Sequence, residues 1–435
     1  MKVSDFFGTE FKAFSQYDNV RSIPSIVDGL KDSQRKAIYG MTLSGSKEIK
    51  VSQLAELTSM KTHYDHGGAS LEGTIVGLAQ NYAGSNNVNV FEPIGQFGSI
   101  LGSEAGASRY IFTKPTKYLR RLFRESDECV LDFKEIDGET VEPVVYNPVL
   151  PIWALNGSNG IGTGYRSLIL PRRLESIIEA AEAIANNDPV DTSLFTPYFN
   201  NWKGVITSED TRWKICGCIE RVNTTTFNIT EIPAGMGIDK VKAALIDLID
   251  SADVKDFNNY SSENGINIEV TSTRKFLSLP DEEILKKLKL ISYVTEQFTF
   301  WDENNNIIVH ESFESALRHF IKLKIDAVDR TRSRRIEILE AEKHYLEHLM
   351  AFIKEWHNLK KVNTMTTDDI IQHMISKGID KNYIDKLMSI KISSLTSDNI
   401  AKHQDRIYTI DGSIMFITNN DPVVMYNGQL FELTN

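Results

Sequence analysis

The sequence predicts a multidomain α+β chain, in which a helix-turn-helix or winged-helix unit precedes an α/β domain and a long coiled-coil helix. Three observations support this prediction. Short helical stretches and a glycine-rich segment, residues 91–106, occupy the first 125 residues. Alternating apolar runs follow up to about residue 305, and a 3-4 spacing of apolar residues then begins near residue 312. A length of 435 residues suffices for two to four domains.

The composition excludes several classes of protein. Apolar residues make up 41% and charged residues 25%, which is ordinary for a globular chain and excludes a mainly disordered, fibrous or disulfide-stapled one. No window approaches 18 consecutive apolar residues, so we expect no membrane span. The start, MKVSDFFGTE, lacks the apolar core of a secretion signal. Three cysteines fit a reducing compartment.

The first region, residues 1–145, is predicted to be the winged-helix unit. Helices are expected over 32–44, 51–60 and 70–82, with Ser70 as the N-cap of the last. The second region, residues 146–305, contains the loop NGSNGIGTG (156–164) and alternating runs at 226–232 and 265–270. Cys216 and Cys218 are expected to share one face of a single strand there, as ordinary strand residues rather than metal ligands.

The third region, residues 306–405, is predicted to be helical. One long helix is expected over about 312–360, with Ile336, Leu339, Lys343, Leu346, Met350 and Ile353 along its coiled-coil seam. Shorter helices are expected near 367–377 and 380–391. Only about ten helix-compatible residues follow before residues 406–435, which contain Asp-Gly and Asn-Gly and are predicted to form a strand-like tail.

Charge is distributed unevenly. The formal net charge is −11, which alone argues against a nucleic-acid partner. Residues 1–124, however, carry 15 Lys/Arg against 11 Asp/Glu, and residues 109–124 contain six basic residues and no acid. A solvated helix face is the plain explanation of so short a run. The interleaved aromatic residues favour a surface that contacts phosphate.

Several sequence patterns bear on chemistry. No G-x-x-x-x-G-K-[ST] motif is present, and no two aspartates stand at an i, i+2 spacing, so neither a Walker ATP site nor a D-x-D metal cluster is expected. The H-x-x-E-H pattern from His344 to His348 matches a zinc-protease motif but lies on the outer side of the long helix, where a solvated face is the favoured interpretation. The NGSNGIGTG glycines indicate a tight turn more than a phosphate-binding loop.

The Arg109–Tyr110 pair is a candidate for nucleophilic attack on a phosphodiester. Tyrosine has a free pKa of about 10 and needs a base or a cation nearby to act as a nucleophile. Arg109 is suited to hold the phosphate and stabilise its charge. The dipeptide alone does not establish such a role.

Seven motifs in order, over about residues 20–400, resemble the breakage–reunion part of type IIA DNA topoisomerases. They are Arg21–Lys36 (RSIPSIVDGLKDSQRK), Lys47–Ala55, Tyr64–Gly67, Gly77–Asn87, Gly95–Ser99 with Ala107–Ile111, Asn156–Gly164, and Thr230–Pro233 followed by Leu387–Thr396. The amino-acid sequences of these motifs are most similar to those of eukaryotic topoisomerase II and of the medium subunit of large tailed bacteriophage enzymes. In this family the second and third regions are a tower domain and a coiled coil with a small helical dimer gate.

The resemblance implies functional residues. Tyr110 would form a 5′-phosphotyrosyl bond with DNA, while Arg109, Arg21, Lys31 and His66 would contact the scissile phosphate, with His66 as a proton acceptor. Ile161 would wedge between base pairs and bend the duplex. Further DNA contacts are expected from Arg35, Lys36, Lys50, Gln96, Ser99, Lys114, Lys117 and Arg120.

The resemblance also implies partners. The family's Mg²⁺ site and its ATPase lie on other domains, so Mg²⁺ and ATP are expected on a partner subunit, with this chain as a homodimer inside a heterotetramer or larger assembly on double-stranded DNA. No metal ligand is expected in this chain and no membrane contact. A bacterial host cytoplasm is the expected location if the chain is phage-encoded. Relaxation and decatenation are expected rather than supercoiling.

Two other classes compete. A non-catalytic DNA-bending scaffold with the same fold would not need Arg21, Lys31, His66, Arg109 and Tyr110 together. A tyrosine recombinase would need an H-x-x-R before the tyrosine, and none precedes Tyr110.

Overall fold

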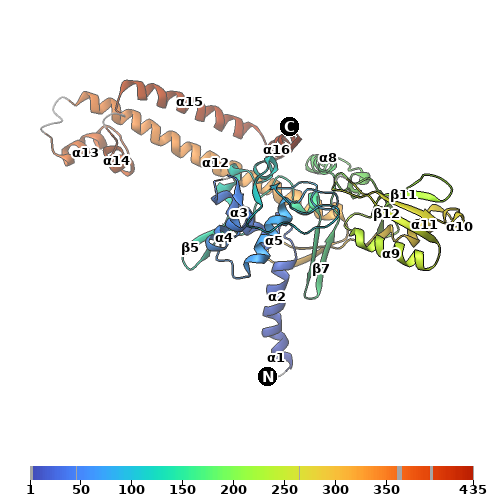
Figure 1. Ribbon diagram of the computed structural model, residues 1–435. Coiled ribbons are helices and arrows are strands. Elements are labelled where there is room, and N and C mark those ends of the chain that lie inside the picture. The colour runs from blue at the N-terminus through green and yellow to red at the C-terminus, as the bar shows by residue number, and fades with distance from the viewer. Residues whose placement is uncertain (1–2, 46, 264, 360–364, 392–394, 435) are drawn as a thin grey trace. The chain divides into compact units, whose positions relative to one another are not determined.

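The computed structural model describes residues 3–45, 47–263, 265–359, 365–391 and 395–434. The chain divides into two compact units, one of residues 1–325 together with 427–435, the other of residues 326–426. Figure 1 labels the elements. None of the helices described is long and apolar enough to cross a lipid bilayer.

The helices of the first unit are α1 (Val3–Gly8), α2 (Glu10–Ser22), α3 (Asp32–Leu43), α4 (Val51–Lys61), α5 (Gly68–Ala79), α6 (Lys117–Leu122), α7 (Ile152–Asn156), α8 (Leu174–Ala185), α9 (Ile238–Asp250), α10 (Arg274–Leu277) and α11 (Asp281–Lys287), with short 3₁₀ turns η1 (Glu125–Val130) and η2 (Thr192–Phe195). Helix α12 (Phe313–Asn358) begins in this unit and continues into the second.

The strands are β1 (Ile49–Lys50), β2 (Phe91–Ile94), β3 (Phe112–Pro115), β4 (Phe133–Ile136), β5 (Glu139–Pro143), β6 (Ser158–Gly162), β7 (Tyr165–Ile169), β8 (Val205–Glu209), β9 (Arg212–Cys216), β10 (Cys218–Arg221), β11 (Thr226–Glu231), β12 (Val254–Asn259), β13 (Ile268–Ser272), β14 (Ile291–Val294), β15 (Phe298–Trp301) and β16 (Ile307–His310). All pairings between these strands are antiparallel.

Helices α3, α4 and α5 pack together beside a small sheet of order β1-β3-β2, as expected of a winged-helix unit (Figure 1). Their apolar sides supply fully buried residues such as Met41, Leu54 and Ile75, because residues three and four apart share one face of a helix. The three helices were predicted within a few residues. Ser70, however, lies in the first turn of α5, whose N-cap is Gly67, so the predicted cap was wrong.

A four-stranded sheet of order β10-β11-β13-β12 packs on α9 to form the core of the tower region. Phe227, Ile229, Ile268 and Val270 alternate inward from the two central strands, as period-2 patterning requires. Cys216 and Cys218 do not share a strand, because β9 ends at Cys216 and β10 of another sheet begins at Cys218. Gly217 lies between the two cysteines. A β-carbon at this position would lie 2.4 Å from the Glu231 carbonyl oxygen, which explains why glycine stands there.

Two charged residues of the first motif are buried in ion pairs. Arg35 donates to both carboxylate oxygens of Asp28, at 2.8 and 3.1 Å, and Lys36 donates to Glu142 at 2.7 Å. Arg35 and Lys36 are 6% and 7% exposed. The prediction that Arg35 and Lys36 contact DNA does not fit this burial. Their charges neutralise carboxylates that would otherwise be unpaired in the core.

The second unit contains the rest of α12 with α13 (Thr367–Ser376), α14 (Lys381–Met388), α15 (Ser397–Asn419) and the start of α16 (Pro422–Thr434). Leu346, Met350 and Ile353 of the predicted seam are buried in one apolar cluster with α13, α14 and α15. Lys343, the charged residue of that seam, pairs with Asp411 of α15 at 2.6 Å. Helix α15 therefore runs back along α12, which a second ion pair between Arg406 and Glu342 also shows.

The predicted strand-like tail is wrong, because residues 406–419 continue α15 and residues 422–434 form α16. Ile407, Ile410 and Ile417 are buried at helical spacing. Gly412 and Gly428 lie within helices, and a β-carbon at either would meet nothing within 4 Å. Each glycine costs about 1 kcal/mol relative to alanine, less than burial of one large apolar side chain contributes. The Asp-Gly and Asn-Gly signals are thus overridden by packing.

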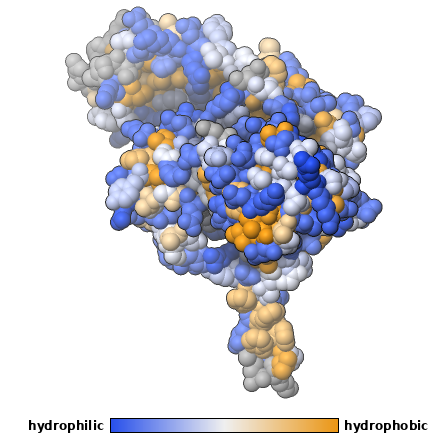
Figure 2. All heavy atoms as spheres, turned by 45° about the vertical axis from the view of Figure 1, so that its right-hand side comes forward, coloured by the Kyte–Doolittle hydropathy of each residue, from blue (hydrophilic) through white to orange (hydrophobic). Residues whose placement is uncertain are grey.

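Apolar side chains are exposed along α1 and α2. Phe7, Phe14 and Val20 are exposed, and the rings of Phe6, Phe7 and Phe11 contact one another. Figure 2 shows these apolar residues gathered on the helix at the lower end of the view. A row of exposed apolar residues is unusual on a monomer surface and is typical of a surface that binds another protein.

Arg35→Ala is expected to lower the free energy of unfolding by about 3–5 kcal/mol, because Asp28 is then left as a buried, uncompensated charge. Arg274→Ala, which removes an exposed arginine, is expected to change it by less than about 0.5 kcal/mol. Urea unfolding followed by circular dichroism measures both. Equal effects of the two variants would contradict a structural role for Arg35.

Candidate nucleic-acid interface

A cavity of about 590 Å³ brings together three of the residues predicted at the cleavage site. Arg21, Lys31 and His66 all line it. They come from the end of α2, the turn before α3 and the turn before α5. Residues spaced up to 45 positions apart thus share one concave surface.

Hydrogen bonds to the buried Asp28 carboxylate hold the turn that carries Lys31. The Asp28 carboxylate is fully buried and accepts bonds from the backbone N–H groups of Leu30 and Tyr146 at 2.9 and 3.0 Å, besides those from Arg35. Gly29 adopts φ +74°, and a β-carbon there would lie 2.5 Å from the Trp153 nitrogen. The conformation of the turn is therefore set by backbone contacts that few sequences allow.

Lys31 points from this turn toward the hairpin of β6 and β7. Its ammonium donates to the Asn159 carbonyl oxygen at 2.6 Å. Burial lowers the pKa of Lys31, because the low-dielectric surroundings disfavour the charged form. A phosphate in the cavity would raise this pKa again by supplying an anionic partner.

His66 is held in place by two tyrosines. Tyr17 of α2 has its hydroxyl 2.9 Å from His66 Nε2, and the rings of Tyr64 and His66 make an edge contact at 5.2 Å. The neighbouring His63 instead lies near Glu139, at 3.5 Å. Tyr17 was missed by the sequence analysis, since the matching motifs begin at about residue 20. Only the fold brings α2 to this turn.

The acids of the cavity already have partners. Asp18 accepts from the Thr163 hydroxyl at 2.7 Å, and Asp32 pairs with Lys134 at 2.8 Å. Burial acts to raise the pKa of Asp32, but the charges of Lys134, Lys36 and Arg35 outweigh it and hold that pKa below its usual value. Arg21 has no carboxylate partner among the residues that the structure describes. The free positive charge of the cavity is therefore that of Arg21, with Lys31 beside it.

The Arg109–Tyr110 pair lies outside this cavity lining, on the loop that follows β2. Tyr110 is 71% exposed, and the Arg109 guanidinium lies 5.1 Å from the centre of its ring. The loop is anchored by bonds from Val51 N to the Ile111 carbonyl and from Ser52 N to the Ser108 carbonyl, at 3.1 and 3.3 Å. A compact scaffold thus presents Tyr110 at the surface.

The glycine loop before Tyr110 is built as a folded unit. Gly95 and Gly98 adopt φ of +108° and +89°, which favours glycine. The Gln96 side chain accepts from Gly98 N at 2.9 Å, and the Ser99 hydroxyl accepts from Leu101 N at 3.2 Å. Both predicted DNA contacts therefore stabilise the loop, while Gln96 also stays exposed.

The remaining basic residues predicted to contact DNA differ in exposure and in whether they already form an ion pair. Lys117 and Arg120 on α6 are exposed and form no ion pair among the described residues. Lys50 lies over the Phe112 ring at 5.9 Å, and Lys114 pairs with Glu92 at 3.3 Å. Lys117 and Arg120 are thus the best placed of these to bind phosphate oxygens.

Ile161 is presented at the end of the β6–β7 hairpin. It is 73% exposed, although a β-carbon at Gly160 would lie 1.8 Å from the Ser22 carbonyl oxygen and one at Gly162 would lie 2.1 Å from Asn19 Oδ1. The two glycines face α2 closely, so alternation along the strand directs Ile161 to the opposite side. Isoleucine is usually a core residue, but Ile161 is exposed between two glycines that pack on α2. This exposure is compatible with the predicted wedge.

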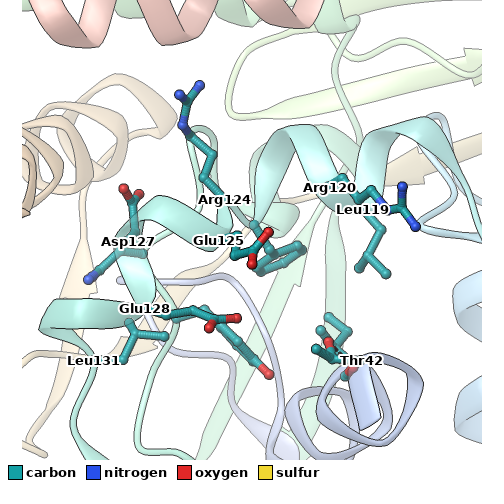
Figure 3. Close-up of a pocket in the computed structure, with 12 residues that line it drawn as sticks. Thr42, Leu119, Arg120, Arg124, Glu125, Asp127, Glu128 and Leu131 are labelled. Atoms are coloured by element: carbon teal, nitrogen blue, oxygen red, sulfur yellow. Dashed lines mark hydrogen bonds between the residues drawn. The ribbon is translucent and has the colours of Figure 1, made fainter. Parts of the chain in front are cut away.

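A second cavity, of about 620 Å³, is lined by residues of α3, α6 and η1 and contains more acids (Figure 3). Glu125, Asp127 and Glu128 line it together with Arg120 and Arg124. Burial, with help from the Glu125 charge, raises the pKa of Glu128. Asp127 is paired with the buried Lys324 at 3.1 Å, and Arg124 with Glu432. The acids make this cavity unsuited to a phosphate backbone.

The fold is similar to that of a solved DNA-binding, cleavage and re-ligation domain. Across 99% of the chain the structure matches the crystal structure of the Plasmodium falciparum topoisomerase II DNA-binding, cleavage and re-ligation domain, with a TM-score of 0.92, 30% identity and 64% of that chain covered. The family model for the DNA gyrase/topoisomerase IV A subunit matches residues 21–427. The chain belongs to this family.

Named relatives agree. The chain is 31% identical to the mitochondrial DNA topoisomerase 2 of Dictyostelium discoideum. The match covers 99% of this chain and 35% of that relative. It is 29% identical to the DNA topoisomerase 2 of Invertebrate iridescent virus 6, covering 100% of this chain and 39% of the relative. The chain thus spans between about a third and two fifths of these relatives.

Gly160→Ala is expected to destabilise the first unit by about 1–3 kcal/mol, because the added methyl group would overlap the Ser22 carbonyl and push the hairpin from α2. Gly68→Ala, in the open first turn of α5, is the control and should be neutral or slightly stabilising. Thermal unfolding compares the two. An unchanged midpoint for Gly160→Ala would mean that the hairpin does not pack as described.

Proposed function

We propose that this chain is the breakage–reunion subunit of an ATP-dependent type IIA DNA topoisomerase, which cleaves both strands of one duplex, lets a second pass and rejoins the first. The observation that carries the proposal is the exposed Tyr110 beside Arg109, together with a cavity lined by Arg21, Lys31 and His66. A nucleophile and several phosphate-binding groups are the parts that transesterification needs.

In the proposed reaction the Tyr110 oxygen attacks a backbone phosphorus. The new bond joins the tyrosine to the 5′ phosphate, the bond to the 3′ oxygen breaks, and the tyrosine proton leaves to a base while the 3′ oxygen takes up a proton. Arg109, Arg21 and Lys31 stabilise the charge that develops on the phosphoryl oxygens. His66, whose Nε2 lies 2.9 Å from the Tyr17 hydroxyl, would be the proton acceptor. Reversal of the same steps rejoins the strand without hydrolysis.

Tyr110 does not line the cavity that holds the other three residues. We infer that the DNA backbone itself connects them, in a homodimer with two such tyrosines that cut opposite strands. Ile161 would insert between base pairs and bend the duplex toward this surface, since apolar side chains of minor-groove binders unstack base steps in this way.

Among the described residues that line this cavity, the two acids already have partners. Asp18 and Asp32 are engaged by Thr163 and Lys134, and the sequence has no D-x-D pair. When bound, Mg²⁺ would supply charge stabilisation at the phosphate. We infer that a partner subunit holds both Mg²⁺ and ATP in a heterotetramer or larger assembly, in a bacterial cytoplasm if the chain is phage-encoded. The exposed apolar face of α1 and α2 supports such a protein partner.

Tyr110→Phe is expected to abolish covalent protein–5′-DNA adducts, because the variant lacks the attacking oxygen. The chain is co-expressed with the ATPase subunit, incubated with Mg²⁺ and supercoiled plasmid, and denatured before adducts are counted on gels. Tyr260→Phe, which alters another exposed tyrosine, should form them normally. Adducts that persist in Tyr110→Phe would rule out the assigned nucleophile. Bent DNA without adducts in the unaltered complex would favour the non-catalytic scaffold.

Ile161→Ala is expected to reduce the bend angle of a bound duplex of about 30 base pairs, measured by fluorescence transfer between its ends, because the wedge is removed without disturbing the core. Affinity should fall by a few kcal/mol at most, in keeping with the cost of unstacking one step. Ile246→Ala, which removes an exposed isoleucine of α9, serves as the matched control. An unaltered bend in Ile161→Ala would contradict the wedge.

A further inference from the structure

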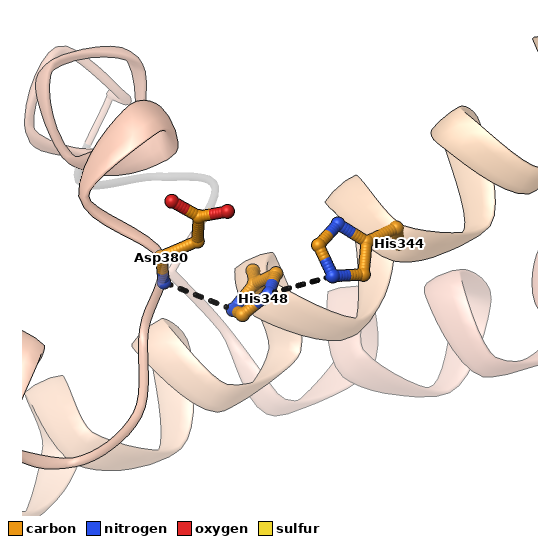
Figure 4. Close-up of side chains that lie close together, drawn as sticks. All are labelled: His344, His348 and Asp380. Carbon is orange, nitrogen blue, oxygen red and sulfur yellow. Dashed lines mark hydrogen bonds between the residues drawn. The ribbon is translucent and has the colours of Figure 1, made fainter.

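Two histidines of α12 meet an aspartate that the sequence pattern does not contain. His344 and His348, one helical turn apart, are the ends of the H-x-x-E-H pattern. Asp380, the N-cap of α14, lies beside them within the second unit (Figure 4). Among the described residues these three are the only cluster of three or more histidine, cysteine or acidic side chains close enough to hold an ion.

The two imidazoles are already spaced for a metal ion. The Nε2 atoms of His344 and His348 lie 3.2 Å apart. A tetrahedral ion with metal–nitrogen bonds of about 2.0–2.1 Å holds two nitrogens roughly 3.3 Å apart. One ligand atom from each of the three residues lies within 4.8 Å of the other two, so rotation of the Asp380 side chain can bring its carboxylate to a shared ion.

The surrounding bonds favour this use of His344 and Asp380. The Tyr383 hydroxyl lies 3.2 Å from His344 Nδ1 and can accept a hydrogen bond from it in the tautomer that leaves Nε2 free to bind. Asp380 Oδ1 caps α14 by accepting from Asn382 N at 2.8 Å. Its Oδ2 has no hydrogen-bond partner within the described part of the chain, so it can bind an ion without loss of the cap.

His348 must change its tautomer to take part. Its Nδ1 lies 3.3 Å from the Asp380 backbone N–H, which without metal places the His348 proton on Nε2, between the rings. Coordination moves that proton to Nδ1 through solvent and gives up the long bond from Asp380 N. The bond between the two Nε2 atoms is given up as well, so two hydrogen bonds are exchanged for a metal–nitrogen bond, and the charge of the imidazole is unchanged.

We propose that His344, His348 and Asp380 form a binding site for a transition-metal dication of the Zn²⁺ class, which links α12 to α14. Imidazole ligands select Zn²⁺, Co²⁺ or Ni²⁺ over Mg²⁺ and Ca²⁺. The site is therefore chemically distinct from the Mg²⁺ requirement of DNA cleavage, and it does not depend on the proposed function. Exposure of His344 leaves the fourth position to water.

A structural role suits the site better than hydrolysis. Glu347, the acid of the H-x-x-E-H pattern, is exposed and is not among the three clustered groups. Tyr383 and Leu387 of α14 pack on the same apolar cluster as Leu346 and Leu349 of α12. An ion at the rim of this contact would fasten the two helices and stabilise the second unit by binding only its folded state.

The test titrates the full chain with Zn²⁺ alone by isothermal calorimetry, in a Cys129→Ser, Cys216→Ser, Cys218→Ser background that removes the free thiols. One Zn²⁺ per chain is expected, unaffected by millimolar Mg²⁺, together with a higher thermal midpoint. His344→Ala should fold normally without metal, since this side chain is exposed, and should lose roughly 100-fold or more in affinity. Tyr383→Phe should lose about 10–100-fold, as expected when a residue that orients a ligand is removed.

A second histidine pair gives the matched control. His310 Nε2 and His319 Nδ1 also lie 3.2 Å apart, but Glu303 contacts the opposite nitrogen of His319, so these groups do not converge on one point. His310→Ala should leave Zn²⁺ binding unchanged. The proposal is overturned if no Zn²⁺ binds, if His344→Ala binds as well as the unaltered chain, or if His310→Ala removes the binding.

Discussion

The buried Asp28 carboxylate is the constraint on which the nucleic-acid surface depends. It accepts two bonds from Arg35 and two from backbone N–H groups, one of them on Tyr146, more than a hundred residues away. A charge without solvent is tolerated only when every lone pair is engaged. The turn before α3 therefore has one arrangement, in which Lys31 reaches the β6–β7 hairpin.

The turn in its single arrangement also contacts the β6–β7 hairpin, and the hairpin packs on α2. Lys31 binds the Asn159 carbonyl, and Gly160 and Gly162 lie so close to α2 that no side chain would fit. The same helix supplies Tyr17 to His66 and Arg21 to the cavity. The elements that carry the phosphate-binding groups and the exposed Ile161 are thus packed on one framework.

Whole-chain charge says little about this surface. The net charge is −11, yet Arg21, Lys117 and Arg120 form no ion pair among the described residues, while Arg35, Lys36 and Lys324 are consumed by buried carboxylates. What matters for phosphate is which cations remain unpaired at the surface. The basic run beside Tyr110 was visible in the sequence, but the pairing state of each charge was not.

The sequence predicted much of the fold, because helix periodicity and strand alternation are local. It located α3, α4, α12 and β11 within a few residues. It failed where a distant partner decided the outcome. In the sequence, Arg35 and Lys36 cannot be told from basic residues that bind DNA at the surface. They are core residues because they pair with the buried carboxylates of Asp28 and Glu142. The tail was misassigned because turn-forming Gly412 and Gly428 gave a stronger local signal than the buried isoleucines that α15 packs against α12.

The same reasoning explains why the two histidines of α12 looked unremarkable in isolation. Two imidazoles one turn apart on an outward face are a common surface arrangement, and a third ligand is what distinguishes an ion site from a solvated pair. That ligand, Asp380, lies 32 residues beyond His348 and reaches it only because α14 packs on the apolar side of α12. In the cavity and in this cluster alike, a local motif supplies only part of the group, and helix packing decides which distant residues complete it.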